Sequence, residues 1–367
     1  MKQQLKNKVT SKNRDNSLDI LRGIAVVAMI LAHTIAFFHT QESEFMNILK
    51  YFGDTITFTT FLLVSGAVLY FAYISIDNKA WKQKRSIVFE RIAKLLIGYY
   101  VVAIISTLRD FPFPPNSEWI FHLLKIFLFV KVPGYTEFLI PFIFYAVIIV
   151  LLRKYVKRML QNELLVFIVA LVAYACGSIL YRISIPLPLH YYVSLLAGED
   201  GWYRFPLLQY TPVLLLGLII GKRIKQAKNQ KSKFIQIFSL STILFVLMSI
   251  TLLIPQLSRF PYSDEFQRWP PSLGFLLTSL AFACMLLTAL NLPLKQKKLL
   301  IPTQLLVFFG RFAFGYYIYH IIILQLEHLL FTWKFSQPSI VFGLFLILLI
   351  LCSLLLLFRQ KYVKNNK

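Results

Sequence analysis

Charged residues are scarce in this chain of 367 residues, since Asp, Glu, Lys and Arg together make up only 15% of it. A soluble domain has about 25% charged and about 45–50% apolar residues. Here 57% of the residues are hydrophobic, 16% are aromatic, and the mean hydropathy is +0.65. This balance excludes a soluble globular enzyme, a coiled coil and a disordered chain. It indicates a polytopic helical protein embedded in the lipid bilayer.

Cysteine is rarer still. The three cysteines, Cys176, Cys284 and Cys352, each lie within an apolar run. They offer neither a disulfide framework nor the ligand spacing of a structural metal site. We therefore expect no metal and no permanently bound cofactor.

Acidic residues are also few, because 16 Asp and Glu stand against 39 Lys and Arg, a net charge of +23. In a soluble protein such an excess would favour nucleic acid as a partner. Here the basic residues cluster in short segments between apolar runs, which is the topology signal of membrane proteins. The sequence therefore predicts a bilayer and no nucleic acid as partner.

Ten apolar runs are long enough to cross about 30 Å of hydrocarbon. A further run at 119–130 is too short and carries His122 and Lys125, so we expect an interfacial or re-entrant segment there. The sequence thus predicts an all-α transmembrane bundle of about ten helices, at 18–38, 54–75, 88–108, 136–152, 163–182, 205–221, 235–254, 272–291, 303–326 and 338–358.

The distribution of Lys and Arg predicts the orientation. With the N-terminus inside, 28 of the 39 basic residues fall on the cytoplasmic side. This follows the positive-inside rule at every inside segment, whereas an eleventh span at 119–130 would invert the later loops. We expect a multi-pass protein of the cell membrane with both termini in the cytoplasm. Its parts are a basic tail at 1–17, a membrane domain at 18–358 and a second basic tail at 359–367.

The first predicted span carries three ionisable residues, Asp19, Arg22 and His33. Charged groups in a membrane are costly and mark candidate functional sites. Asp19 and Arg22 are three residues apart and are expected to pair. Arg22 and His33 are eleven apart, which places them on one helix face about 16 Å from each other.

The ninth predicted span carries Arg311, His320 and Glu327. Arg311 and His320 are nine residues apart, so they are expected to point to opposite faces, while His320 and Glu327 are seven apart and share a face. His320 lies at much the same depth in its span as His33 in the first. Either histidine could instead serve only as a hydrogen-bonding partner between helices.

Two groups of loop residues could bind ligands. Before the third span, a basic stretch could bind phosphate, or could simply be a positive-inside loop. On the predicted outer side, two loops combine aromatic and acidic residues, which suits a sugar but also fits an interfacial aromatic belt. The candidates are Lys84, Arg85, Arg91 and Lys94 inside, and Asp200, Trp202 and Arg268 outside.

Several segments resemble the transmembrane acyltransferase superfamily, meaning acyltransferase family 3 and relatives of the heparan-glucosaminide acetyltransferase type. The opening helix LDILRGIAVVAMILAH is similar to that of the family, as is the second helix FLLVSGAVLYF. The segments VFERIAKLL and FGRFAFGYYIYHIII resemble its basic loop and its late histidine helix. RWPPSLGFLL resembles a segment of the heparan-acetyltransferase branch.

The resemblance implies acyl transfer, most simply of acetyl, from cytoplasmic acyl-CoA to an acceptor across the membrane. It maps essential roles onto His33 and Arg22, with the late histidine at His320. Donor binding maps onto Arg91 and Lys94, with Arg85 and Lys84 beside them. The family often has two arginines four apart where this chain has Glu90 and Lys94. The individual roles in this loop therefore stay open.

Several alternatives remain. His39 competes with His33 as the catalytic base, and direct transfer competes with a covalent acyl-histidine. Tyr316, Tyr317 or Tyr319 could bind the carbonyl oxygen. The expected acceptor is a hydroxyl of a cell-surface glycan or lipid-linked sugar, with N-acylation as the second choice. A transporter or flippase for such a molecule would also use intramembrane Arg and His. The sequence leaves the oligomeric state open and allows a homo-oligomer.

Overall fold

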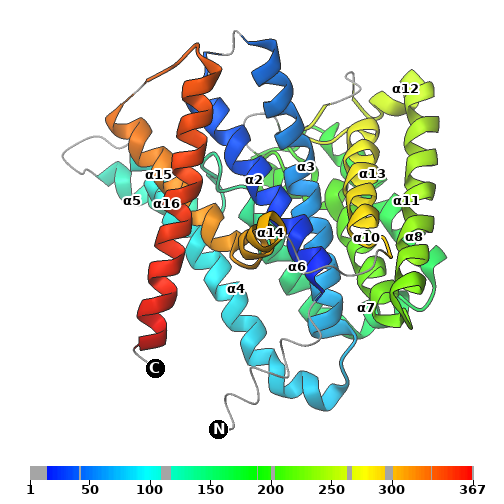
Figure 1. The fold of residues 1–367 in the computed structure, drawn as a ribbon. Coiled ribbons are helices and arrows are strands. Elements are labelled where there is room, and N and C mark those ends of the chain that lie inside the picture. Colours follow the sequence, from blue (N-terminus) through cyan, green and yellow to red (C-terminus); the bar gives the residue numbers. More distant parts are fainter. Residues whose placement is uncertain are drawn as a thin grey trace.

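The computed structural model describes residues 15–40, 43–108, 117–187, 189–199, 203–262, 267–293, 301–331 and 333–365. Within these ranges every regular element is a helix (Figure 1). The elements are α2 (Asn16–Phe38), α3 (Glu44–Leu69), η1 (Tyr70–Ile74), α4 (Asn78–Thr107), α5 (Ser117–Phe127), α6 (Leu139–Leu151), α7 (Arg153–Met159), α8 (Glu163–Tyr181), α9 (Leu189–Ala197), α10 (Leu207–Gln226), α11 (Gln230–Leu253), α12 (Pro255–Arg259), α13 (Leu273–Leu290), α14 (Ile301–Arg311), α15 (Ala313–Leu330) and α16 (Pro338–Asn365).

The predicted all-helical membrane class is confirmed. Seven helices of the described chain are long and apolar enough to cross a membrane, or nine if each of two bent pairs forms one span. The predicted span 88–108 corresponds to the last two thirds of α4, which carries Arg91 and Lys94. The number ten and the side on which each terminus lies stay predictions. The segment at 119–130 forms a short helix, α5, as its length suggested.

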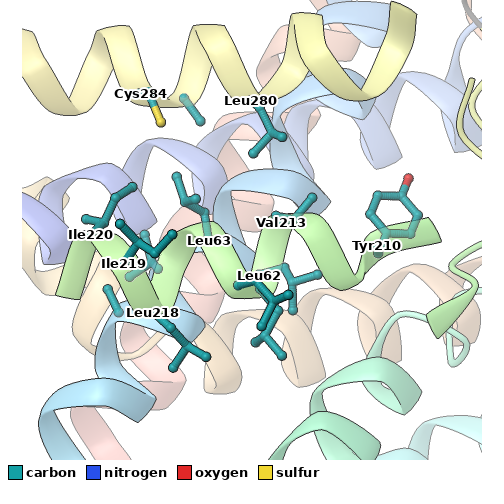
Figure 2. Packing of buried hydrophobic residues seen from close by; sticks show 14 of the residues in the cluster. Leu62, Leu63, Tyr210, Val213, Leu218, Ile219, Ile220, Leu280 and Cys284 are labelled. Carbon is teal, nitrogen blue, oxygen red and sulfur yellow. The ribbon is translucent and has the colours of Figure 1, made fainter. Parts of the chain in front are cut away.

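Helix α2 lies at the centre of the bundle, packed along α3 and crossed by α14 (Figure 1). We call the end of the bundle that holds the turn from η1 to α4 the inner end. The outer end holds the last turn of α2 and the first turn of α3. One buried apolar cluster joins α3, α10 and α13, as Figure 2 shows with Leu62, Val213 and Leu280. A second joins α2, α4, α15 and α16.

Glycine permits the close approach of α3 and α10. A Cβ added at Gly66 would lie 2.5 Å from the carbonyl oxygen of Leu214, and one at Gly217 would lie 2.2 Å from that of Leu63. Side chains at either position would force the two backbones apart. This crossing fixes α3, which lines both cavities described below.

The prediction of one continuous helix at 303–326 is wrong. The chain bends by 79° between α14 and α15, at Phe312. Helix α14 crosses α2 near the inner end, where Gly310 packs on the backbone of Asp19, and α15 then continues toward the outer end. The opposite orientations predicted for Arg311 and His320 assumed a straight helix, so that inference fails. A second bend, of 86°, separates α6 from α7.

Candidate active site

Two cavities lie along α2 and α3. The outer cavity, of about 130 Å³, is lined by His33 of α2 together with Thr57 and Phe58 of α3, and by residues of the segments around 135–138, 204–210 and 269–275. The inner cavity, of about 210 Å³, is lined by Arg22 of α2 and by Arg91 of α4, together with Leu62 and Ser65 of α3. A histidine thus faces one cavity and two arginines face the other.

His33 contacts His320 directly. Nδ1 of His33 lies 2.9 Å from Nε2 of His320, and the two rings stack with centroids 5.2 Å apart. His320 is fully buried and comes from α15, which the bend at Phe312 directs along α2. The equal depth predicted for the two histidines is therefore confirmed.

A chain of hydrogen bonds fixes the tautomers of both rings. Nδ1 of His320 lies 2.7 Å from the carbonyl oxygen of Tyr316, which can only accept, so Nδ1 carries the proton. In the neutral ring Nε2 of His320 is then an acceptor, and it accepts from Nδ1 of His33. The lone pair of His33 therefore lies on Nε2, which makes no hydrogen bond to the described residues. This is the arrangement of a general base oriented by a second residue.

A loop ahead of α6 forms the opposite wall beside His33. The ring of Tyr135 meets that of His33 edge-on, with centroids 5.1 Å apart. Tyr135 has a φ of 69°, an uncommon left-handed conformation for a residue other than glycine. The hydroxyl of Tyr317 donates to the carbonyl of Tyr135 and holds this loop, while the hydroxyl of Tyr316 pairs with Ser353. Neither Tyr316 nor Tyr317 lines the outer cavity.

His39 does not line either cavity. It is buried, and its Nδ1 lies 3.0 Å from the carbonyl oxygen of Phe335, which ties the end of α2 to the segment before α16. The geometry therefore favours His33 over His39 as the base.

At the inner cavity, two of the predicted basic residues come together from different helices. Nη1 of Arg91 donates to the hydroxyl of Tyr73 at 3.2 Å. Arg22 lies 3.6 Å from Asp19, so the predicted ion pair is present, and Asp19 also lies 3.5 Å from Arg311. Both arginines line the cavity, and together they could bind phosphate.

The other predicted basic residues lie away from this cavity. Lys84 and Arg85 are exposed on the first turns of α4, and Lys94 pairs with Glu90 at 2.6 Å on the helix surface. Of the four candidates on α4, the structure places only Arg91 in the cavity wall. Whether the other three contact a donor beyond it stays a prediction.

The outer cavity also holds charged residues that the sequence analysis did not single out, namely Lys50, Asp54, Glu137 and Arg204. Of the predicted outer residues, Arg268 pairs with Asp54 beside the cavity, whereas Asp200 and Trp202 lie outside the described residues. Glu137 could have been singled out in the sequence, because it is the one carboxylate within the predicted apolar span 136–152.

Glu137 lies in the non-helical segment ahead of α6 and is only 4% exposed. Its carboxylate lies 3.6 Å from Nε of Arg204 and accepts from the backbone N–H of the same residue. Burial raises the pKa of this carboxyl from 4.5 to about 7, and Arg204 only partly opposes the shift. Burial of the charged form therefore destabilises the fold at high pH.

We expect Glu137→Gln to stabilise the protein increasingly as the pH rises from 5 to 8. In the folded state the carboxyl of Glu137 has a pKa of about 7, whereas in the unfolded chain its pKa is near 4.5. Above pH 7 this difference in pKa lowers the free energy of unfolding by about 3 kcal/mol, and Gln removes that loss. Thermal unfolding of both proteins in detergent across this range measures it. If the difference between the two unfolding midpoints did not change with pH, the raised pKa of Glu137 would be contradicted.

Three aromatic rings connect the walls of the two cavities. Phe58 and Phe138 line the outer cavity and Phe142 lines the inner one. The three rings contact each other, with centroids 5.3 to 5.8 Å apart.

Comparison with known families agrees with this geometry. A family model described as an acyltransferase domain, of acyltransferase family 3, matches residues 15–359, which is nearly the whole chain. A search of curated proteins gives no match. The match includes the helices that carry His33, Arg22, Arg91 and His320. The chain therefore belongs to acyltransferase family 3 and is a multi-pass membrane acyltransferase.

Proposed function

We propose that this protein transfers an acyl group, most simply acetyl, from acyl-CoA at the inner cavity to a hydroxyl of a glycan or lipid-linked sugar at the outer cavity. The observation that carries the proposal is that two residues of α2 line two different cavities. Arg22 lines one cavity and His33 lines the other, about 16 Å further along the helix. By the predicted orientation, the donor enters from the cytoplasm and the acceptor lies on the outer side of the cell membrane.

The inner cavity suits the donor. The phosphates of CoA need cations, and guanidinium groups bind them through paired N–H donors. Arg91 and Arg22 provide two such groups from separate helices. Most of the other lining residues of that cavity are apolar, Leu62, Val68 and Leu95 among them, and they suit an extended pantetheine arm.

His33 then acts as general base. Nε2 takes the proton of the acceptor hydroxyl as its oxygen attacks the carbonyl carbon of the thioester. The carbon–sulfur bond breaks, and the leaving thiolate takes the proton from the imidazolium. His320 holds Nδ1 of His33 and stabilises the protonated ring, so His320 is a positioning residue. Direct transfer needs no covalent enzyme intermediate, and we propose it as the simpler course.

The donor side is tested by ligand binding. We expect acetyl-CoA and free CoA to raise the thermal unfolding midpoint of the purified protein in detergent. Arg91→Ala should weaken apparent binding by about tenfold or more, because a charge-assisted contact is worth about 1.5–3 kcal/mol. Lys82→Ala is the control, since Lys82 is exposed on the same helix and does not line the inner cavity.

Equal loss in both variants would mean that CoA binds to general surface charge and not in the inner cavity. Failure of a folded wild-type protein to respond to any acyl-CoA would overturn the donor assignment. The thiol released from acetyl-CoA, measured with a range of glycan acceptors, separates transfer from transport, because a transporter consumes no thioester.

A further inference from the structure

Arg204 is a charged residue in the lining of the outer cavity. Its Nε lies 3.6 Å from Glu137, and its guanidinium carbon lies 4.5 Å from the centre of the Trp269 ring. These two contacts orient the group. Its two Nη atoms make no hydrogen bond to any residue within the described ranges, and its side chain is 40% exposed. A planar pair of N–H donors is thus held in place without a hydrogen-bond partner in the part of the chain that the structure describes.

A second cation, Lys50, lines the same cavity. Lys50 lies 3.3 Å from Asp54, but Asp54 also pairs with Arg268, so one carboxylate serves two cations. Arg268 in turn stacks on Trp269, with its guanidinium carbon 4.1 Å from the ring centre. Among the described residues, this wall therefore carries more positive than negative charge.

Glu137 does not fully neutralise Arg204. Its carboxyl is buried and has a pKa raised to about 7, so near neutral pH a large share of the molecules carry it in the protonated form. Its closest approach is to Nε and to the backbone N–H of Arg204. The outward pair of Nη donors is left available for a ligand.

We propose that Arg204 and Lys50 form an anion subsite that binds a carboxylate or phosphate of the acceptor beside His33. The acceptor is then a hydroxyl of a negatively charged glycan, such as a uronic-acid polymer, or of a phosphate-linked sugar or polyol. Guanidinium recognises both oxyanions through two parallel hydrogen bonds. The assignment of this cavity to the acceptor rests on the proposed function.

Binding without any donor tests the subsite independently of catalysis. We use purified full-length protein in detergent, and as probes a glucuronic-acid oligosaccharide, glycerol phosphate and a neutral glucose oligosaccharide at matched ionic strength. At least one charged probe should raise the unfolding midpoint and the neutral one should not. Arg204→Gln should weaken this binding by about tenfold or more, because a charge-assisted pair is lost. Arg204→Lys, which keeps the charge but loses the paired donors, should be intermediate.

Arg259→Gln is the control, because Arg259 is exposed on α12 and does not line the outer cavity. Equal stabilisation by charged and neutral probes, or equal loss in the Arg259 variant, would overturn the subsite. The response to the carboxylate and phosphate probes distinguishes the two acceptor types.

Turnover provides the second readout. With acetyl-CoA and a charged acceptor, Arg204→Gln should raise KM for the acceptor by about tenfold and leave kcat within about threefold. A fall in kcat at unchanged KM would assign Arg204 to the reacting carbonyl and overturn the subsite. If charged probes bind but no acceptor consumes acetyl-CoA, the proposed reaction fails while the anion subsite stands.

Discussion

Replacing His33 by alanine is expected to lower acyl transfer by about 10²–10⁴-fold while acyl-CoA still stabilises the protein. This is the range that a positioned general base contributes. His33 lines the outer cavity, and its Nε2 is the nitrogen left as an acceptor once the carbonyl of Tyr316 and the ring of His320 have fixed both tautomers. The arginines of the inner cavity are untouched, so donor binding should be preserved. Thiol release from acetyl-CoA and ligand-dependent thermal unfolding measure the two effects.

His39→Ala provides the control for this prediction. His39 is six residues further along the chain, and its contact with Phe335 is structural. Its replacement should lower stability and leave transfer per folded molecule within about threefold. The opposite result, with His39→Ala inactive and His33→Ala active, would exchange their roles. Loss of donor binding in His33→Ala would instead place the histidine in the donor site.

The equal depth of His33 and His320 could be predicted because depth in a membrane is counted along the chain. Both spans were expected to run outward, and each histidine lies near the same depth. Hydrophobic length fixes where a span begins and ends to within a few residues, so α2, α8 and α13 match their predicted ranges closely.

Counting along the chain did not predict which residues of the basic stretch before the third span face a cavity. Its charge was evident, but only Arg91 faces the inner cavity. Val88, Arg91, Ile92 and Leu95 all line that cavity, and they follow one face of α4 at helical spacing, whereas Lys94 lies off that face. Net charge is a property of the loop, while participation in a site depends on the face of the helix.

The charged residues of the outer cavity could not be predicted as a group. Lys50, Glu137 and Arg204 come from three separate segments and meet only through packing. In the sequence, no motif singled out Lys50 or Arg204. Pairing across such distances leaves no periodic pattern in the chain.

The bend between α14 and α15 likewise has no signal in hydrophobic periodicity. It depends on the crossing of α14 over α2, where a Cβ added at Gly310 would lie 1.8 Å from the carbonyl oxygen of Asp19. A Cβ added at Gly23 would lie 2.0 Å from that of Leu306. The two glycines allow backbone to meet backbone, and this contact directs α15, and with it His320, toward His33.

Gly310→Ala is therefore expected to destabilise the protein by more than about 3 kcal/mol, or to prevent its recovery in folded form. The added methyl group meets main-chain atoms of Asp19 and Gly23 in α2, which cannot rotate away, so the crossing has to open. Opening it shifts α15 and separates His320 from His33, so acyl transfer should fall in whatever folded protein remains. Thermal unfolding and thiol release on the same preparation measure both effects.

Gly343→Ala makes the matching substitution where a Cβ on α16 meets nothing within 4 Å. Alanine is the better helix former, so this variant should be as stable as the wild type or more stable by about 0.5–1 kcal/mol. The same change of residue thus has opposite signs at the two sites, because only Gly310 lies at a crossing of helices. Equal unfolding midpoints for the two variants would mean that α14 does not pack on α2 as closely as described. The link from this crossing to the contact between His33 and His320 would then fail as well.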